Sequence, residues 1–340
     1  MKNEYSLITM VVVGFNQEVF IHEAIQSAFN QDYPNLEIIL SDDCSTDHTF
    51  KIMEDMASTY SGMHRVVARK NICNVGTALH LQFCYEVSNG CLLVFQAGDD
   101  LSTHDRVSKL VRKWQEKGCP EGAVHSGRYI FENSSENVIG TKKATVIGDG
   151  DVLANWKKWL NKELPACPTT CAFTRGVFCK FQPLFGGSVI DDGPLQFRAA
   201  LIGVFIRVDE PLIYQRVGIE SAGTNMSILS IPRWNRLMQS RIIACRTSQS
   251  DLKIHSENIF VPDLKKIEKN LLSYAKSCAL LLLPERDVGF LDKIYFSLNV
   301  LFRSPKSRSF FNRASFLIVF FRFEKVIRFA KYIKNIVKHR

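Results

Sequence analysis

The chain has 340 residues, of which 46% are hydrophobic and 23% charged, which favours a globular protein with about two domains, or one large α/β domain with appendages. Its 43 basic and 34 acidic residues give a formal net charge of +9. However, residues 301–340 hold 11 of the basic residues and one acidic residue. The rest of the chain is nearly neutral, which argues against a protein that binds nucleic acid across its surface.

The cysteines and the apolar segments indicate a cytoplasmic protein. The ten cysteines include no C-x-x-C pair, so no zinc site is expected. The N-terminal apolar run lacks the cleavage site of a signal peptide, and unpaired thiols without an export signal predict a reducing compartment. The longest uncharged apolar runs are far shorter than the ~20 residues that a membrane-spanning helix needs.

The first half of the chain alternates between strand and helix patterns. Residues 7–13 form a continuous apolar run, typical of a strand buried on both faces. Helical spacing follows over residues 18–30, and further strands are predicted over 36–40, 65–68 and 91–95. A second helix is predicted between the second and third strands, with Phe50, Met53 and Met56 on one side, and a third helix is predicted over residues 76–87. Four strands separated by three helices predict a parallel, doubly wound sheet.

Such sheets bind ligands in the loops at the carboxyl ends of their strands. In this sequence those loops are residues 14–18, 42–47, 71–76 and 96–101. Only one glycine, Gly14, follows the first strand, so the G-x-G-x-x-G dinucleotide fingerprint is absent, and a P-loop is absent too. These absences argue against a dehydrogenase and a P-loop NTPase.

An ordered series of motifs extends over roughly residues 7–221. The motifs are Val11-Val12-Val13-Gly14-Phe15-Asn16, Asn30-Gln31-Asp32-Tyr33-Pro34, Ser41-Asp42-Asp43-Cys44-Ser45-Thr46-Asp47, Asn74-Val75-Gly76, Gln96-Ala97-Gly98-Asp99-Asp100, Arg175, Gly186-Gly187 and Asp191-Asp192-Gly193-Pro194-Leu195. This series closely resembles the family 2 glycosyltransferases of the GT-A fold. The resemblance implies an α/β fold with a GT-A-like, doubly wound and mostly parallel sheet, and we expect a helical, basic C-terminal extension to follow it.

Transfer from a sugar nucleotide requires a pocket for the base. Asp43 follows the second strand, where a carboxylate can accept the N–H of a pyrimidine ring. The alternative is that Asp42 and Asp43 only cap the next helix, but two adjacent acids exceed what a cap needs. The resemblance implies that further nucleotide-binding residues are Phe15, Asn16, Glu18, Asn74, Gly76, Asp99 and Arg216.

The diphosphate of the donor needs a cation, and Mg²⁺ or Mn²⁺ takes one or two carboxylates plus substrate phosphates. Asp99 and Asp100 directly follow a buried strand, as the acids of the family's D-x-D motif do. Ala97 stands where the first acid of that motif is usual. We expect Asp99 and Asp100 to bind the metal; a solvated Gly-Asp-Asp turn is the alternative.

Inverting transfer is a single displacement and needs a base opposite the leaving group, as inverting glycosidases do. Asp191 and Asp192 resemble the family's acidic pair, and Asp192 is the predicted base, with Asp191 as second choice. Alternatively, both acids complement a helix N-terminus. Arg216 lies in a segment that resembles the family's closing strand, where Gly218 replaces a frequent histidine.

We predict a catalytic domain over residues 1–221, with a nucleotide-binding half over about 1–105 and an acceptor half over about 106–221. A helical extension would occupy residues 222–340. Over about 310–340 its apolar residues follow helical spacing and are flanked by lysines and arginines. Such an amphipathic basic tail predicts peripheral binding to an anionic membrane surface; a helix packed on the catalytic domain is the alternative.

The predicted activity is therefore inverting transfer of a sugar from a nucleotide sugar, with a UDP-sugar as first choice, to a hydroxyl. A lipid-linked glycan acceptor at the inner face of the cell membrane, in surface-polysaccharide synthesis such as O-antigen assembly, is inferred from the family and the tail. Two alternatives remain. One is a sugar-phosphate nucleotidyltransferase, which would want a Gly- and Arg-rich loop after the first strand. The other is a non-catalytic module that binds sugar nucleotides or membranes.

Overall fold

The structure is a computed structural model that describes residues 5–132, 137–144, 168–184, 192–217, 231–255, 267–268 and 271–272. The chain forms two compact units. The first comprises Met1–Gly218 and Ile243–Ser273, and the second comprises Ile219–Ile242 and Tyr274–Arg340. Of the second unit, only residues 231–242 are described, so the fold described below is that of the first unit. The predicted domain boundary at residue 221 stays a prediction.

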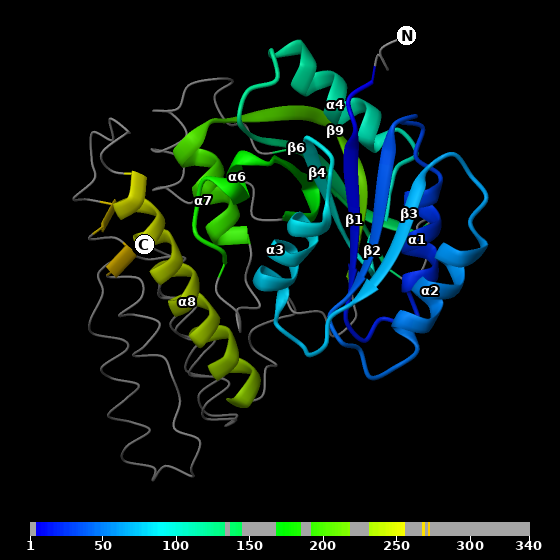
Figure 1. Cartoon of the computed structure of the whole chain (residues 1–340), viewed down its shortest axis with the longest axis horizontal. Helices are drawn as coiled ribbons and strands as arrows, with labels where there is room; N and C mark the ends of the chain where they lie inside the picture. Colours follow the sequence, from blue (N-terminus) through cyan, green and yellow to red (C-terminus); the bar gives the residue numbers. More distant parts are fainter. Residues whose placement is uncertain are drawn as a thin grey trace, which may run out of the picture. The chain divides into compact units, whose positions relative to one another are not determined.

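The first half of the chain forms the predicted alternation of parallel strands and helices (Figure 1). β1 pairs in parallel with β2 and β4, and β2 pairs in parallel with β3. The strands are β1 (Ile8–Gly14), β2 (Leu36–Asp42), β3 (Arg65–Lys70) and β4 (Leu92–Ala97), and the helices are α1 (Ile21–Phe29), α2 (Thr49–Thr59) and α3 (Thr77–Val87).

Helix α1 begins at Ile21, three residues later than the sequence pattern predicts. The carbonyl of Gln17 accepts the N–H groups of Phe20 and Ile21, each at 2.9 Å. Just before it, Asn16 has a φ of 53°, in the left-handed region that asparagine tolerates better than most residues. The chain therefore makes a turn between β1 and α1, and this turn carries several of the predicted site residues.

The second half of the sheet is mixed rather than parallel. β8 lies between β4 and β6 and is antiparallel to both, whereas β6 and β9 are parallel. The strand order is β3-β2-β1-β4-β8-β6-β9-β5, with β7 on β6. The elements are β5 (Leu101–Ser102), α4 (Arg106–Glu116), β6 (Gly122–Phe131), β7 (Val138–Lys142), a 3-10 turn (Pro168–Thr170), β8 (Cys171–Thr174), α6 (Gly176–Cys179), α7 (Asp192–Ile202), β9 (Val204–Arg216) and α8 (Ile231–His255).

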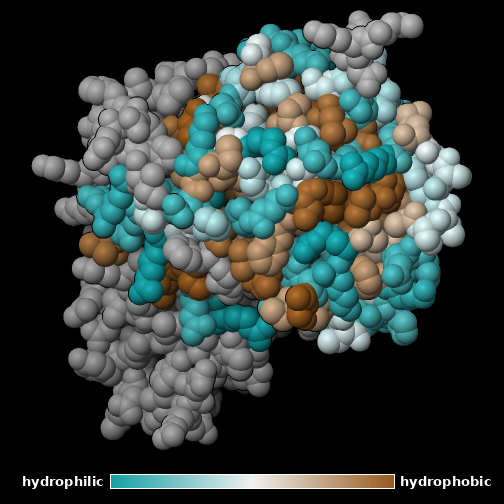
Figure 2. All heavy atoms as spheres, viewed as in Figure 1, coloured by the Kyte–Doolittle hydropathy of each residue, from teal (hydrophilic) through white to brown (hydrophobic). Residues whose placement is uncertain are grey.

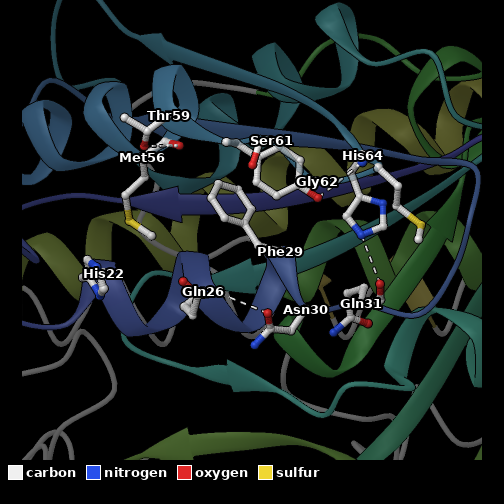
Figure 3. Close-up of a pocket in the computed structure, with 12 residues that line it drawn as sticks. His22, Gln26, Phe29, Asn30, Gln31, Met56, Thr59, Ser61, Gly62 and His64 are labelled. Atoms are coloured by element: carbon white, nitrogen blue, oxygen red, sulfur yellow. Dashed lines mark hydrogen bonds between the residues drawn. The ribbon is translucent and has the colours of Figure 1, made fainter.

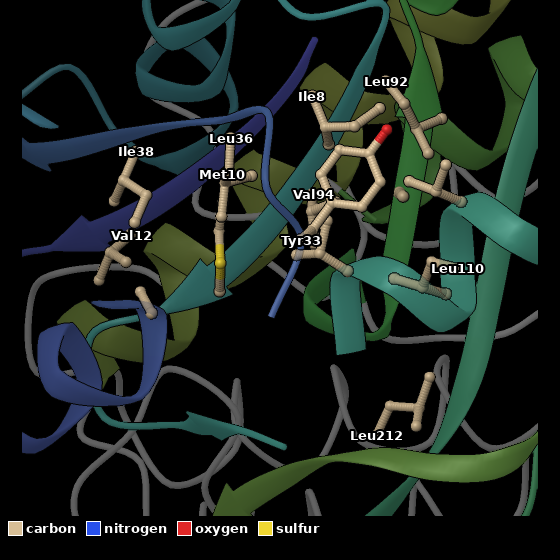
Figure 4. Close-up of a cluster of buried hydrophobic side chains, with 14 of the residues drawn as sticks. Ile8, Met10, Val12, Tyr33, Leu36, Ile38, Leu92, Val94, Leu110 and Leu212 are labelled. Atoms are coloured by element: carbon tan, nitrogen blue, oxygen red, sulfur yellow. The ribbon is translucent and has the colours of Figure 1, made fainter. Parts of the chain in front are cut away.

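Both faces of the sheet are covered by helices, which explains why β1 is apolar throughout. Ile8, Met10 and Val12 pack with residues of α1, α2 and α4 on one face (Figure 4). Val11 points to the other face and packs with residues of α3, α6 and α7. Burial of a side chain of this kind contributes about 1.5–3 kcal/mol, so the continuous apolar run is needed for a sheet buried on both sides.

The surface of the described part is mixed in character. On the face shown in Figure 2, hydrophilic residues separate the hydrophobic patches from one another. No helix in the part of the chain that the structure describes is both long and apolar enough to cross a bilayer.

Candidate functional site

The loops that follow β1, β2, β3 and β4 meet at one edge of the sheet. The N–H of Asp43 donates to the carbonyl of Gly14 at 2.9 Å, and the N–H of Gly98 donates to the carbonyl of Val13 at 2.8 Å. A third backbone bond joins the ends of β2 and β3. The four loops predicted from the sequence therefore form one continuous region at the carboxyl ends of the strands, where doubly wound sheets bind ligands.

Two predicted residues after β1 fix the loop that follows β2. The Oδ1 of Asn16 accepts the backbone N–H of Thr46 at 2.9 Å. The Oε2 of Glu18 accepts the backbone N–H of His48 at 2.9 Å and lies 2.8 Å from its Nδ1; the backbone bond is the main cause of the lowered pKa of Glu18. Phe15, by contrast, leaves its side chain 46% exposed, so its ring remains available to a ligand.

The two adjacent acids at the end of β2 have different surroundings. Asp42 is completely buried and accepts hydrogen bonds from the backbone N–H of Ser45 at 2.8 Å and from the Ser45 hydroxyl. This is the geometry of a side chain that closes a turn. Asp42 thus closes the turn after β2, and Ser45 lies before α2, which begins at Thr49; neither acid caps this helix.

Asp43 instead accepts hydrogen bonds from the loop between β3 and α3. Its Oδ1 accepts the side-chain amide of Asn71 at 2.8 Å and the N–H of Val75 at 3.0 Å. Its Oδ2 accepts the N–H of Gly76 at 3.0 Å, and its carbonyl accepts the side chain of Asn74 at 3.3 Å. Because Oδ2 accepts one of these bonds, it keeps acceptor capacity for an N–H of a ligand. The structure therefore brings Asp43, Asn74 and Gly76 together, as predicted.

A buried polar network supports Asp43 through Asn71, and the sequence analysis did not predict it. The ring of His80 lies 2.6 Å from the Ser41 hydroxyl, to which Arg69 also donates at 2.6 Å. Arg69 donates further to the side-chain oxygen of Asn71 at 2.5 Å, and Asn71 reaches Asp43. These residues belong to β2, β3 and α3 and to the loop after β3, so no local spacing in the sequence predicts the network. The only sequence signal is that polar residues interrupt otherwise apolar segments.

The network should make stability depend on pH through His80. Burial lowers the pKa of His80 from 6.5 to about 4, so protonation favours the unfolded chain. The contribution of neutral His80 is complete above about pH 6.5 and is lost as the pH falls towards 4, by up to about 3 kcal/mol. The free energy of unfolding, measured with urea at neutral and at acidic pH, should fall less between the two pH values in His80→Gln than in the wild type. His22→Gln, at an exposed position, is the control. If His80→Gln loses as much free energy of unfolding at acidic pH as the wild type does, His80 is not the cause of the pH dependence.

The predicted metal-binding acids lie in a tight turn after β4. Asp100 is buried, with its N–H donated to the Ala97 carbonyl at 3.1 Å. The side chain of Gln96 holds the turn by donating to the Asp100 carbonyl at 3.1 Å. Burial, together with the neighbouring Asp99, raises the pKa of Asp100 to about 8, and burial also raises the pKa of Asp99. The positive charges of Arg216 and Arg106 offset this effect only in part, and a bound cation would add further positive charge beside the two carboxylates.

Arg216 reaches the same turn from the end of β9. Its backbone N–H donates to Oδ1 of Asp100 at 3.1 Å, and its Nε donates to the carbonyl of Asp99 at 3.1 Å. Its guanidinium also pairs with Glu23 at 2.8 Å and lies over the rings of Phe20 and Phe131. Arg216 therefore lies beside Asp99 and Asp100, with its guanidinium engaged in holding the turn. Its role in donor binding stays a prediction.

The side chains of this turn suit a divalent cation that takes some of its ligands from the protein and the others from a substrate. Within the described ranges, no group of three or more histidine, cysteine, aspartate or glutamate side chains could hold a metal by itself. Asp99 and Asp100 are two adjacent carboxylates at the ligand-binding edge, and Mg²⁺ typically uses one or two carboxylates plus phosphate oxygens. The residues present therefore suit a cation brought in with a diphosphate.

The predicted base lies at the edge of what the structure describes. Asp192 is the first residue of α7, but its side chain, the whole of Asp191 and the Gly186-Gly187 pair lie outside the described residues. Arg175, another residue of the motif series, stacks on Tyr85, with 4.5 Å between guanidinium and ring centroid, and donates to the carbonyl of Ser88 at 3.0 Å, so it has a structural role.

A separate groove of about 620 Å³ lies between α1 and α2 (Figure 3). It includes the loop that precedes β3, and so lies towards the amino end of that strand, opposite the ligand-binding edge. Its described lining residues include no aspartate, glutamate, lysine or arginine. Without these charges the groove does not suit a diphosphate, and the strand-end loops remain the candidate site.

Comparison with known proteins agrees with this geometry. The model of the family described as glycosyl transferase family 2 matches residues 9–180, about half of the chain. The chain belongs to glycosyl transferase family 2. The match contains Asp43 with its hydrogen-bond partners and the Asp99–Asp100 turn, so this edge of the sheet lies within the region shared with family 2 glycosyltransferases.

Curated relatives of this family 2 chain match over less than half of their own length. A Bacillus subtilis protein assigned as the glycosyltransferase EpsE is 35% identical over 123 residues, which is 36% of this chain and 43% of EpsE. TuaG of Bacillus subtilis, assigned to teichuronic acid biosynthesis, is 27% identical over 119 residues, 35% of this chain and 46% of TuaG. The UDP-Glc:alpha-D-GlcNAc-diphosphoundecaprenol beta-1,3-glucosyltransferase WfaP of Escherichia coli is 27% identical over 105 residues, 31% of this chain and 40% of WfaP.

Solved structures confirm the GT-A fold of this family 2 glycosyltransferase. The mannosyltransferase PcManGT of Pyrobaculum calidifontis, solved with GDP-Man and Mn²⁺, gives a TM-score of 0.53 at 17% identity, covering 94% of this chain and 86% of that chain. S. aureus TarS 1-349, solved with UDP-GlcNAc, gives a TM-score of 0.51 at 15% identity, covering 95% and 92%. The mixed second half of the sheet belongs to this fold.

Proposed function

We propose that this family 2 glycosyltransferase transfers a sugar, with inversion, from a nucleotide sugar to a hydroxyl of a lipid-linked glycan. The donor of first choice is a UDP-sugar, and the cation is Mg²⁺ or Mn²⁺. The observation that carries the proposal is the placement of Asp43 and the Asp99–Asp100 turn on one edge of the sheet, where the strand-end loops meet. A base-binding carboxylate and a cation-binding pair are the two features that a nucleotide-sugar donor requires.

Each side chain has a defined task in this proposal. Asp43 accepts a base N–H through Oδ2, and the exposed ring of Phe15 offers a stacking surface for the base. Asn16 and Glu18 act by fixing the loop that follows Asp43. Bound beside Asp99 and Asp100, a divalent cation would neutralise the charge that develops on the diphosphate as it leaves.

The relatives support the choice of donor and acceptor. The name of WfaP describes transfer of glucose from UDP-Glc to a diphosphoundecaprenol-linked sugar, and TuaG is assigned to teichuronic acid synthesis. The chain is similar to less than half of each of these proteins, and we extend their chemistry to it as part of the proposal. Surface-polysaccharide synthesis on a lipid carrier is the resulting proposal, with O-antigen as one such product.

The two alternative functions differ in their demands on the site. A sugar-phosphate nucleotidyltransferase would want a Gly- and Arg-rich loop after β1, whereas this loop is Gly14-Phe15-Asn16 and the family is that of glycosyltransferases. A non-catalytic module would bind the donor without cleaving it. The alanine at position 97 is the observation that keeps this second alternative worth testing.

A donor screen tests the function directly. The full chain is incubated with UDP-, GDP- and dTDP-sugars, and release of the nucleoside diphosphate is measured with Mn²⁺ and with EDTA. We expect UDP release that requires the metal and recovers when Mg²⁺ or Mn²⁺ is restored. Full activity in EDTA would show that basic side chains alone stabilise the diphosphate, and absence of release from every donor would favour the binding module.

The C-terminal tail supports a cytoplasmic, peripheral location on the inner face of the cell membrane. The tail over about 310–340 lies outside the described residues, so the proposal rests on its sequence, in which 11 basic residues fall within 301–340. Each basic residue near an anionic surface contributes about 1 kcal/mol. Co-sedimentation with anionic vesicles, comparing the full chain with one that ends near Ser304, tests it; equal pelleting would reject the anchor.

A further inference from the structure

The side chain of Gln17 lies against the turn that contains Asp99 and Asp100. Gln17 follows β1, far from this turn in sequence, and its side chain lowers the pKa of Asp99, which burial raises. Its Oε1 lies so close to Gly98 that a Cβ added there would come within 2.3 Å of it. The absence of a side chain at Gly98 therefore gives Gln17 access to the predicted cation-binding acids.

The oxygen of this amide has no hydrogen-bond partner among the described residues, although it is shielded from solvent. The backbone of Gln17 is firmly held, because its N–H donates to Thr49 Oγ1 at 2.7 Å and its carbonyl accepts two N–H groups at the start of α1. A buried acceptor without a partner is costly, and an ion that binds in the functional state is one physical explanation.

The neighbouring donor set is short of protein ligands. Ala97 stands where the family's motif usually has an acid, which leaves Asp99 and Asp100 as the carboxylates of the turn. Mg²⁺ prefers six oxygen ligands, and a donor diphosphate and water supply only some of them. An amide oxygen is a hard ligand of the same kind as a carboxylate oxygen, without its charge.

We propose that Gln17 supplies a neutral oxygen ligand to the divalent cation beside Asp99, compensating for the acid that is absent at Ala97. This inference rests on the metal-dependent transfer proposed above. A neutral ligand in place of a carboxylate leaves the cation with one more unit of uncompensated positive charge. The site thereby attracts the donor diphosphate more strongly than a site with three acids would.

The alternative is that Gln17 only pins Asp99 by donating a hydrogen bond. Gln17→Glu separates the two roles because it keeps the length of the side chain, adds a carboxylate and removes the N–H. If Gln17 is a ligand, the added charge should raise the affinity for Mn²⁺ by about tenfold. If Gln17 only pins Asp99, the lost donor and the new repulsion should lower that affinity instead.

The experiment is a Mn²⁺ titration of the full chain, followed by the electron paramagnetic resonance signal of free Mn²⁺, with and without UDP. Gln17→Ala and Gln17→Met should each weaken binding by about tenfold. Gln82→Ala is the matched control, since Gln82 on α3 also has a buried Oε1 without a partner among the described residues. Its affinity should equal that of the wild type. Thermal unfolding in EDTA establishes that each variant is folded.

The outcomes separate this inference from the proposed function. A wild-type chain that binds no Mn²⁺, with or without UDP, overturns both the metal dependence and the role of Gln17. Wild-type binding that Gln17→Glu weakens overturns the role of Gln17 alone. If the Glu variant does not fold, Gln17→Met still tests the proposal, because it fills the same space: affinity equal to the wild type overturns it.

Discussion

Replacement of Asp192 by asparagine is expected to lower sugar transfer by ~10²–10⁴-fold and to leave donor binding intact. In a single displacement the acceptor hydroxyl attacks as the bond to the diphosphate breaks, so a base must take its proton while the attack develops. Asparagine has a similar size but cannot take the proton. Asp192 opens α7, and the sequence Asp191-Asp192-Gly193-Pro194 resembles the acidic segment that supplies the base in this family.

Two measurements distinguish the base from a helix-capping acid. Donor affinity is measured by calorimetry and transfer by product formation, for Asp192→Asn and for the matched variant Asp191→Asn. If the acids only complement the helix N-terminus, both variants should lose some thermal stability and keep their turnover. Wild-type turnover in Asp192→Asn would remove Asp192 from the reaction, and a large loss in Asp191→Asn alone would transfer the role to that residue.

The second large effect is expected at the buried ion pair between α7 and α8. Arg198 and Asp251 are both almost completely buried, and the guanidinium donates to the two carboxylate oxygens at 2.8 and 3.1 Å. Arg198 also donates to the carbonyl of Gln182 at 2.7 Å and lies 4.9 Å from the centroid of the Phe181 ring. Asp251→Ala should lower the free energy of unfolding by about 3–5 kcal/mol, because it leaves a buried charge without its counterion.

Urea unfolding measures this loss, and a double variant tests its cause. In Arg198→Met/Asp251→Leu no charge is stranded, so most of the stability should return. The exposed pair of Lys51 and Asp55, 2.7 Å apart, provides the control, and Lys51→Ala should give no measurable change. Equal losses in the single and double variants would show that packing, and not the stranded charge, is responsible. Because α7 begins at Asp192, Asp251→Ala should also reduce transfer.

The sequence alone was sufficient for the architecture of the first half and for the position of the strand-end loops that form the candidate site. Periodicity is a local property, so the apolar run of β1 and the helical spacings that follow it predict their elements directly. Parallel strands place their carboxyl ends together, so Asp43, Asn74 and Asp99 could be assigned to one edge without knowledge of any contact. The mixed pairing of β6, β8 and β9 was less accessible, since it joins segments separated by intervening chain.

Only the tertiary structure shows which hydrogen bonds each polar side chain makes at that edge of the sheet. Asp42 and Asp43 are adjacent and identical in sequence terms, yet one closes its own turn and the other binds a loop about 30 residues further along the chain. Likewise, no local pattern places Gln17 over Gly98. Hydrogen bonds between distant segments depend on the register of neighbouring strands and on the exact path of each loop. A local pattern cannot encode these features, because they exist only after the sheet has formed.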